Sequence, residues 1–170
     1  MEQKEDTLLE NEKIRSIQEQ DDAGMAEIVR YNLEKYHLNI PGTAYFDPEL
    51  DHLSQFYHAD PEHRMYVVME DTNGSIIGGV GIAEFEGIES CAELQKLYLA
   101  DAAKGKGLGR RLLNFAEVSA KNKGYRYLYL ETHSALKEAI HLYQKAGFEQ
   151  IEKPDCVKHG TMDTFYWKKL

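Results

Sequence analysis

Cysteine is scarce in this sequence, and no metal-binding pattern accompanies it. The 170 residues contain only Cys91 and Cys156, too few for a disulfide framework, and neither lies in a CxxC pair or has a histidine at metal-ligand spacing. The seven histidines are scattered and form no HExxH motif. We therefore expect two reduced, structural cysteines and no metal site.

The chain also lacks a basic excess and a long apolar run. Its formal net charge is −9, which argues against a nucleic-acid partner, because phosphate binding needs surplus Lys and Arg on one face. No apolar stretch approaches the roughly 20 residues of a membrane-spanning helix. The first residues, 1–6, lack the basic start and apolar stretch of a signal peptide. We expect a cytoplasmic protein without membrane contact, whose acidity mildly favours a cationic substrate such as an amine.

Hydrophobic periodicity and turn residues predict one α/β domain over residues 13–170, after a polar tail over residues 1–12. The predicted strands cover residues 13–17, 65–70, 75–85, 91–99, 125–131, 148–152 and 161–168. The first predicted helix begins at Asp21 or Asp22 and ends near Tyr36. Three further helices are predicted over residues 49–57, 108–122 and 135–146. The order β-α-α-β-β-β-α-β-α-β-β indicates a mixed sheet with helices on both faces.

Two groups of glycines are unusual. Gly78, Gly79 and Gly81 lie inside a predicted strand, which indicates a bulge or the close approach of another group to the backbone. Gly105, Gly107 and Gly109 alternate in a turn between the strand over 91–99 and the helix over 108–122.

The second group predicts a phosphate or pyrophosphate site. Bare backbone lets several N–H groups converge on one anion, and the start of the following helix adds partial positive charge. Full positive charges come from Lys104, Lys106, Arg110 and Arg111. The alternative is a glycine-rich turn that binds nothing.

The turn matches neither of two common phosphate motifs. A Rossmann fingerprint would place its last glycine at Arg110 or Leu112, and no Walker sequence is present. The pattern [Q/R]-x-x-G-x-[G/A] fits at Gly107 in the fourth position and Gly109 in the sixth, and Lys104 replaces Gln or Arg in the first, a mild departure that leaves the backbone role of the turn unchanged. This pattern resembles the acyl-CoA loop of the GNAT family of N-acetyltransferases.

A second stretch is similar to the other signature of that family. Residues 139–148 read Ala-Ile-His-Leu-Tyr-Gln-Lys-Ala-Gly-Phe, close to A-[IR]-x-L-Y-x-K-x-G-F. The two stretches are separated by one helix–strand unit, as in the family. The resemblance implies a GNAT-like fold with a mixed, mostly antiparallel sheet flanked by helices on both faces.

The resemblance also implies how acetyl-CoA is held as co-substrate. The strand before the glycine turn splays from its neighbour, and main-chain groups of Leu97, Tyr98 and Leu99 hold the pantetheine. An N–H near Leu99 polarises the thioester carbonyl. Amides hold the pyrophosphate, from Lys104, Gly105, Lys106, Gly107, Leu108, Gly109 and Arg110. Leu136 stands where the family often has a pantetheine-binding Asn, so that contact is not expected here.

The implied reaction is direct attack of a primary amine on acetyl-CoA while both substrates are bound. Tyr143 matches the family tyrosine that protonates the leaving thiolate, since a phenol stays protonated at neutral pH. Glu93 is the expected general base; Glu131, His133 and a water chain are alternatives. A non-catalytic domain that binds acyl-CoA or a metabolite is the second hypothesis.

The acceptor amine is not identified, and small molecules, peptides and proteins all stay open. The irregular stretch over 37–48 is the expected acceptor loop. Its aromatic neighbourhood either lines that site or covers the core, and comprises Tyr36, His37, Tyr45 and Phe46. The family often forms homodimers, but no interface is predicted.

Overall fold

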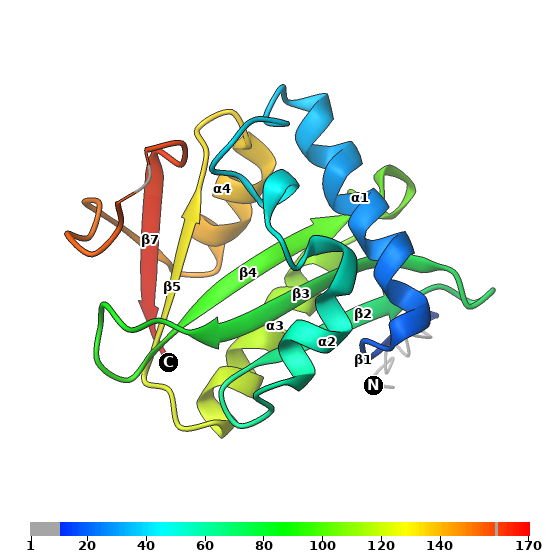
Figure 1. Ribbon diagram of the computed structural model, residues 1–170, viewed down its shortest axis with the longest axis horizontal. Helices are drawn as coiled ribbons and strands as arrows, with labels where there is room; N and C mark the ends of the chain where they lie inside the picture. Colours follow the sequence, from blue (N-terminus) through cyan, green and yellow to red (C-terminus); the bar gives the residue numbers. More distant parts are fainter. Residues whose placement is uncertain (1–10, 159) are drawn as a thin grey trace, which may run out of the picture.

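The computed structural model describes residues 11–158 and 160–170, which form a seven-stranded sheet with helices on both faces (Figure 1). The strands are β1 (Lys13–Ser16), β2 (Met65–Glu70), β3 (Ile76–Glu84), β4 (Cys91–Leu99), β5 (Tyr127–Thr132), β6 (Glu149–Ile151) and β7 (Thr164–Lys169). The helices are α1 (Asp22–Lys35), α2 (Leu53–His58), α3 (Leu108–Asn122) and α4 (Lys137–Lys145). Short 3-10 turns include η2 (Ala44–Phe46), η3 (Leu50–His52) and η4 (Asp101–Ala103).

The predicted fold class is confirmed. The strand order is β1-β2-β3-β4-β5-β7-β6, and every neighbouring pair is antiparallel except β4 with β5. Predicted and observed bounds agree for β2, β4 and α3, whereas β7 begins at Thr164 rather than at residue 161. Residues 1–10 of the expected polar tail lie outside the described residues.

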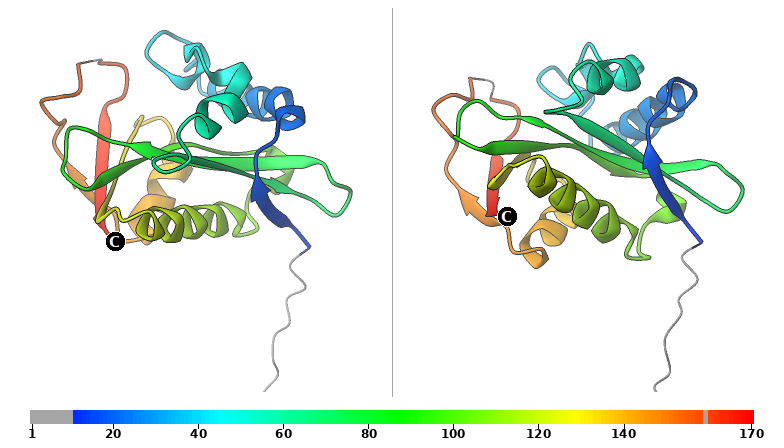
Figure 2. Two further views of the ribbon diagram at one scale, coloured as in Figure 1. Left: turned by 60° about the horizontal axis from the view of Figure 1, so that its bottom comes forward. Right: turned by 90° about the horizontal axis from the view of Figure 1, so that it is seen from below.

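Each face of the sheet has its own apolar core. Helices α1 and α2 cover one face, and α3 and α4 cover the other (Figure 2). The amphipathic spacing of α1 buries Met25, Val29 and Leu33 on the first face. On the second face α3 buries Leu112 and Ala116. Alternate residues of the central strands serve opposite cores, which decides the side on which each site residue lies.

All three glycines of β3 are closely approached, as predicted: Gly78 by the Leu99 side chain, and Gly79 and Gly81 by aromatic rings. A Cβ at Gly79 would lie 2.7 Å from the ring of Tyr66, and one at Gly81 would lie 2.6 Å from Tyr66 and 3.0 Å from Tyr57. Both tyrosines are buried on the α1/α2 face. The bare strand therefore lets large rings lie directly on the sheet.

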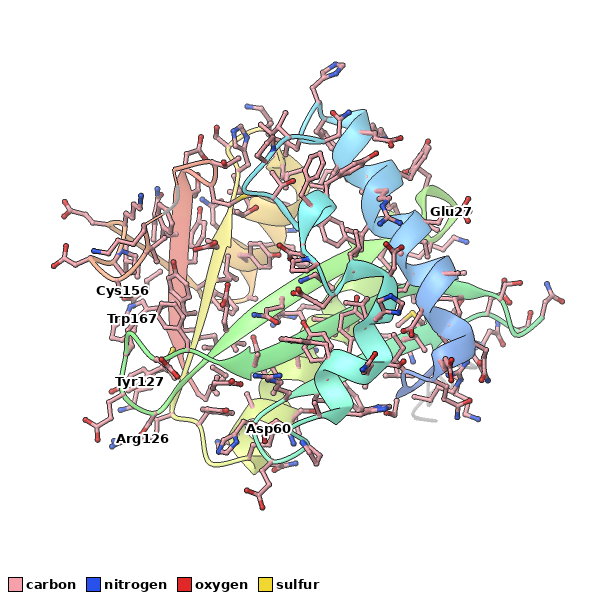
Figure 3. The ribbon with its side chains drawn as sticks, in the orientation of Figure 1. Glu27, Asp60, Arg126, Tyr127, Cys156 and Trp167 are labelled. Carbon is pink, nitrogen blue, oxygen red and sulfur yellow. The ribbon has the colours of Figure 1, made fainter. Side chains whose placement is uncertain are left out.

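Aromatic pairs hold β5 beside its neighbours at the end remote from the glycine turn. Tyr127 on β5 and Trp167 on β7 stack with ring centroids 5.0 Å apart and lie near one another in Figure 3. Phe85 stacks on Tyr129 at 4.2 Å.

Both cysteines are free thiols, with Cys91 buried and Cys156 exposed. Over the part of the chain that the structure describes, no helix has the length and apolar character to cross a membrane.

Candidate active site

The central strands β4 and β5 separate, as the family resemblance implies. They are paired only from Cys91 to Glu93 on β4 and from Tyr127 to Tyr129 on β5. Beyond these residues β4 continues to Leu99 and β5 to Thr132, and the two strands point apart (Figure 1). A cleft of about 870 Å³ occupies this gap and is lined by β4, β5, the glycine turn, α4 and residues 42–49.

A bulge in β4 turns the strand along the cleft. The register against β3 shifts between Gly79 and Gly81, and Lys96 has a φ of 49°. The Tyr66 hydroxyl donates to the Lys96 carbonyl oxygen at 2.8 Å and so holds the bulge. Leu97 then faces the α3/α4 core, whereas Tyr98 faces the α1/α2 core.

The Lys96 side chain fixes one wall of the cleft. Its side chain is only 5% exposed, and its ammonium lies 2.7 Å from an Asp47 oxygen and 3.2 Å from a Glu49 oxygen. Both carboxylates belong to the segment between η2 and η3 that lines the cleft. The ion pairs therefore tie this segment to β4.

The glycine turn presents free N–H groups to open space. Gly105 and Gly107 have φ values of 75° and 76°, and a Cβ on either would meet nothing within 4 Å. Gly107 caps α3, and the first intrahelical bond is from the Arg111 N–H to the Gly107 oxygen. The amides of the preceding helical residues, 108–110, therefore point out of the helix, which suits an anion.

The basic residues of the turn have different roles. The Arg110 side chain lines the cleft and has no ion-pair partner among residues 11–158 and 160–170. Arg111 instead pairs with the Glu12 carboxylate at 3.5 Å. Lys106 is exposed and lies outside the described lining of the cleft.

Lys104 differs from the expectation for it. Its N–H donates to the Asp101 carbonyl oxygen at 3.2 Å, so this amide is already used within η4. Its ammonium lies 2.6 Å from the Asn32 side-chain oxygen and 2.9 Å from the Asp101 carboxylate. Lys104 still lines the cleft, but its contacts anchor the turn to α1.

Asn32 is a site residue that the sequence analysis missed. It is buried on the inner face of α1, where its amide nitrogen donates to the Leu99 carbonyl oxygen at 2.9 Å and to Ile28 at 2.8 Å. The Leu99 carbonyl is therefore already hydrogen-bonded. A polar residue at an inward-facing helical position was the available signal, because buried amides require partners.

Tyr143 lies where the second signature predicts, on the α3/α4 side of the gap. Helix α4 begins at Lys137, so Leu136 is its N-cap. The Tyr143 side chain is 7% exposed and lines the cleft, with its ring against Phe148 and Tyr166 at 5.8 and 6.3 Å. Burial raises the pKa of the Tyr143 phenol well above its ordinary value, so the phenol is protonated at neutral pH.

Glu93 lies in the cleft, on the opposite face of the sheet from Tyr143. Burial, and then the neighbouring Glu131 carboxylate, raise the pKa of Glu93 to about 7. The Gln95 amide donates to a Glu93 oxygen at 3.2 Å. A carboxyl group that titrates near neutral pH is suited to accept a proton.

The alternative bases are placed differently. Glu131 lines the cleft and accepts a hydrogen bond from the Tyr129 hydroxyl at 3.1 Å. His133 accepts from the Ala135 N–H at 3.1 Å in the turn after β5, outside the described lining of the cleft. Glu93 and Glu131 are therefore brought together, and His133 is not.

The predicted acceptor loop, residues 37–48, contributes both aromatic and acidic groups to the cleft. Tyr36 and Phe46 line the cleft, and Phe46 is 57% exposed. The Tyr45 hydroxyl instead donates to the Glu34 carboxylate at 2.6 Å. His37 is exposed and is not among the described residues that line the cleft. Two of the four predicted residues therefore lie at the site.

Charge is divided along the cleft. Near the glycine turn and α4 the lining carries three basic side chains, Lys104, Arg110 and Lys145, and one acidic side chain, Glu138. Near the acceptor loop the lining carries four carboxylates and one ammonium, from Asp47, Glu49, Glu93, Glu131 and Lys96. Within the described ranges, no three His, Cys, Asp or Glu side chains gather closely enough to hold a metal ion.

Comparisons with known proteins agree with this geometry. A family model described as the acetyltransferase (GNAT) family matches residues 27–148. YjgM of Escherichia coli (strain K12), an uncharacterized N-acetyltransferase, is 40% identical over 141 residues, which cover 82% of this chain and 83% of that protein.

Solved structures share the fold. PaiA N-acetyltransferase from Thermoplasma acidophilum, in complex with coenzyme A, has a TM-score of 0.73 at 21% identity, over 94% of this chain and 99% of that chain. A GNAT superfamily phosphinothricin acetyltransferase from Sinorhizobium meliloti, in complex with acetyl-CoA, has a TM-score of 0.72 at 24% identity, over 94% and 89%. The family model spans most of the chain and includes the cleft-forming strands, the glycine turn and Tyr143, and the chain therefore belongs to the GNAT family of acetyltransferases.

Proposed function

We propose that the protein is an N-acetyltransferase that moves an acetyl group from acetyl-CoA to a primary amine, with both substrates bound together. The observation that best supports this proposal is the splayed gap between β4 and β5, which has the glycine turn at one end and the carboxylates Glu93 and Glu131 at the other. The coenzymes in the Thermoplasma and Sinorhizobium structures support acetyl-CoA as the donor.

The cleft fits a pantetheine arm and a pyrophosphate. Beyond Glu93, the β4 edge that faces β5 has no strand partner among the described residues, so an extended, amide-bearing chain can pair with Leu97, Tyr98 and Leu99. The free amides of residues 108–110, the bare Gly105 and Gly107, and the Arg110 guanidinium suit the pyrophosphate. Bound acetyl-CoA supplies the acetyl group as an activated thioester.

The acid and the base act from opposite sides of the sheet. Tyr143, on the α3/α4 side, gives its phenolic proton to the departing thiolate, and burial keeps the phenol protonated until then. Glu93, on the α1/α2 side, takes the proton that the attacking amine loses. Most of the remaining acceleration comes from holding the amine and the thioester in line across the gap.

The acidic end of the cleft supports a cationic acceptor. Lys96 is paired with Asp47 and Glu49, whereas Glu93 and Glu131 face the gap. A protonated amine is attracted to this end, and the exposed ring of Phe46 offers a face to a cation. An acceptor that carries a carboxylate beside its amine is disfavoured.

A CoA-release assay with a panel of amines tests the proposal. The panel contains a diamine, a lysine-containing peptide, an aminoglycoside and an acidic amino acid, each with acetyl-CoA. Amine-dependent release of CoA together with N-acetylated product supports the enzyme, and the cationic amines are expected to react faster than the acidic one. Tight binding of acetyl-CoA with no product from any amine would instead indicate the non-catalytic binding module.

A further inference from the structure

Gln95 lies two residues after Glu93 on β4 and bridges it to a tyrosine of α2. Its amide nitrogen donates to a Glu93 oxygen at 3.2 Å, and its amide oxygen accepts from the Tyr57 hydroxyl at 2.6 Å. An ionised carboxylate only accepts hydrogen bonds, so it requires the NH₂ end of the amide. Tyr57 donates to the other end and thereby fixes the orientation of the amide.

Tyr57 is itself held rigidly. Its side chain is 0% exposed, and its ring lies against Tyr66 at a centroid distance of 5.1 Å. A Cβ at Gly81 would lie 3.0 Å from the Tyr57 ring and hydroxyl. The bare β3 backbone therefore provides the space for this ring, and close packing gives its hydroxyl one direction.

We propose that Gln95, oriented by the Tyr57 hydroxyl, is a positioning residue that aims the Glu93 carboxylate into the cleft toward the acceptor amine. This inference rests on the proposed role of Glu93 as general base. Gln95 acts through Glu93, and Tyr57 acts through Gln95. The unit spans α2, β3 and β4, and so connects the α1/α2 face to the reacting group.

The electrostatic surroundings of Glu93 give this unit a measurable effect. Burial and the Glu131 carboxylate raise the pKa of Glu93, and Asp47 adds to this effect, while the Gln95 hydrogen bond and the Lys96 ammonium lower the pKa. The other titratable groups that face Glu93 are Cys91 on β4, Tyr129 on β5 and Tyr57 on α2. The Gln95 hydrogen bond is one of the two interactions that lower the Glu93 pKa, so removal of the Gln95 donor is expected to raise this pKa.

The test measures the Glu93 pKa directly, without an acceptor. Protein labelled with ¹³C at the glutamate carboxyl is titrated by NMR, and the Glu93 signal is assigned from the Glu93→Gln variant. Gln95→Met is expected to raise the Glu93 pKa, and Tyr57→Phe to raise it less, because the amide then keeps its donor but loses its orientation. The Tyr57→Phe variant keeps every ring contact and carries the test if Gln95→Met does not fold.

A double variant and a matched control make the test specific. If Tyr57 acts only through Gln95, the pKa in Tyr57→Phe/Gln95→Met equals that in Gln95→Met, because the two effects share one path. Tyr125→Phe removes a hydroxyl of the same kind, whose hydrogen bond goes to the His63 carbonyl oxygen and not to a residue that lines the cleft. The control is expected to leave the Glu93 pKa unchanged. Additive shifts, an equal shift in the control, or no shift in Gln95→Met would overturn the proposal.

Activity separates this inference from the proposed function. With the best amine of the panel, the acidic limb of the kcat/KM profile is expected to move to higher pH in Gln95→Met, in the same direction as the NMR titration. If the NMR titration shows a shifted Glu93 pKa while the acidic limb of the kcat/KM profile does not move, Gln95 still positions Glu93. That result would overturn Glu93 as the base.

Discussion

The two ends of the cleft differ in whether main-chain groups or side chains form them. The proposed coenzyme end consists mainly of main-chain groups: the unpaired edge of β4, the bare glycines at 105 and 107, and the first amides of α3. The acceptor end consists of side chains from three separate segments, including Asp47, Glu93 and Glu131. A backbone site accepts any sequence that keeps its turn and strand, so it suits a coenzyme common to many enzymes. A side-chain site changes with each substitution, so it suits the substrate that differs.

Glycine itself has opposite purposes at two places near the cleft. At Gly81 in β3, a side chain would collide with the rings of Tyr57 and Tyr66, so the missing side chain serves packing. At Gly107, a side chain would meet nothing within 4 Å, so the missing side chain leaves room for a ligand. A substitution at Gly81 is therefore expected to change stability, and one at Gly107 to change binding.

The largest expected effect is that of Gly107→Trp on coenzyme binding. The indole fills the space in front of the α3 amides, and we expect CoA affinity measured by isothermal titration to fall beyond about 1,000-fold, or about 4 kcal/mol. Gly124→Trp is the matched control, because Gly124 also has a positive φ, 92°, and open space but lies at the far end of α3. Equal losses in both variants would show that strain, and not a filled site, explains the effect.

The next effect concerns the stability at the acceptor end. The Glu93 pKa of about 7 lies above its ordinary value of 4.5, so the folded state binds the extra proton between these pH values and stability falls as pH rises through them. We expect Glu93→Gln to be more stable than the wild type by about 3 kcal/mol near pH 8, with the difference vanishing below the ordinary pKa. Urea unfolding at a series of pH values measures this difference.

Glu84 provides a control of opposite sign for that series. Its hydrogen bonds to Arg64 lower its pKa, so Glu84→Gln is expected to lose stability at neutral pH. A Glu93→Gln variant that is less stable than the wild type near pH 8 would contradict the buried, destabilising carboxylate.

Tyr143→Phe tests the acid between the two ends. The ring contacts with Phe148 and Tyr166 remain, and we expect kcat to fall about 100-fold with little change in KM for acetyl-CoA. Steady-state kinetics of CoA release measure both constants. Tyr166→Phe removes a neighbouring hydroxyl that is not part of the described cleft lining, and its kcat is expected to stay close to that of the wild type. A fully active Tyr143→Phe would remove the phenol from the mechanism.

The smallest expected effect is that of the charge at the coenzyme end. Arg110 lines the cleft, whereas Arg111 is paired with Glu12 and is not among the described residues that line the cleft. We expect Arg110→Ala to weaken CoA binding about 10-fold, as for one charge-assisted hydrogen bond, and the loss to shrink as salt screens the charges. Arg111→Ala is expected to leave CoA affinity nearly unchanged in the same titration. Equal losses would mean that net charge, and not the position of Arg110, attracts the coenzyme.

The coenzyme end was more predictable from sequence than the acceptor end. Strand β4, the turn with Gly105 and Gly107, and helix α3 follow one another along the chain, so local patterns contain the whole arrangement. Tyr143 could be identified from the sequence because a contiguous signature surrounds it. The Lys96 pairs with Asp47 and Glu49 depend on a bulge and on segments far apart in sequence. For the same reason Tyr57 and Gln95 could be assigned only from tertiary contacts. Asn32 left a sequence signal, a polar residue on the inner face of a helix, but its partner Leu99 could not be predicted.

Amide hydrogen exchange with and without CoA shows where the coenzyme binds along the chain. We expect slower exchange at residues 97–99 on β4 and at residues 108–110 at the start of α3 when CoA is bound. We expect no change in β1 and β2, at the edge of the sheet remote from β5. Protection of other segments, with the splayed edge of β4 left unprotected, would show that the coenzyme does not occupy the gap between β4 and β5.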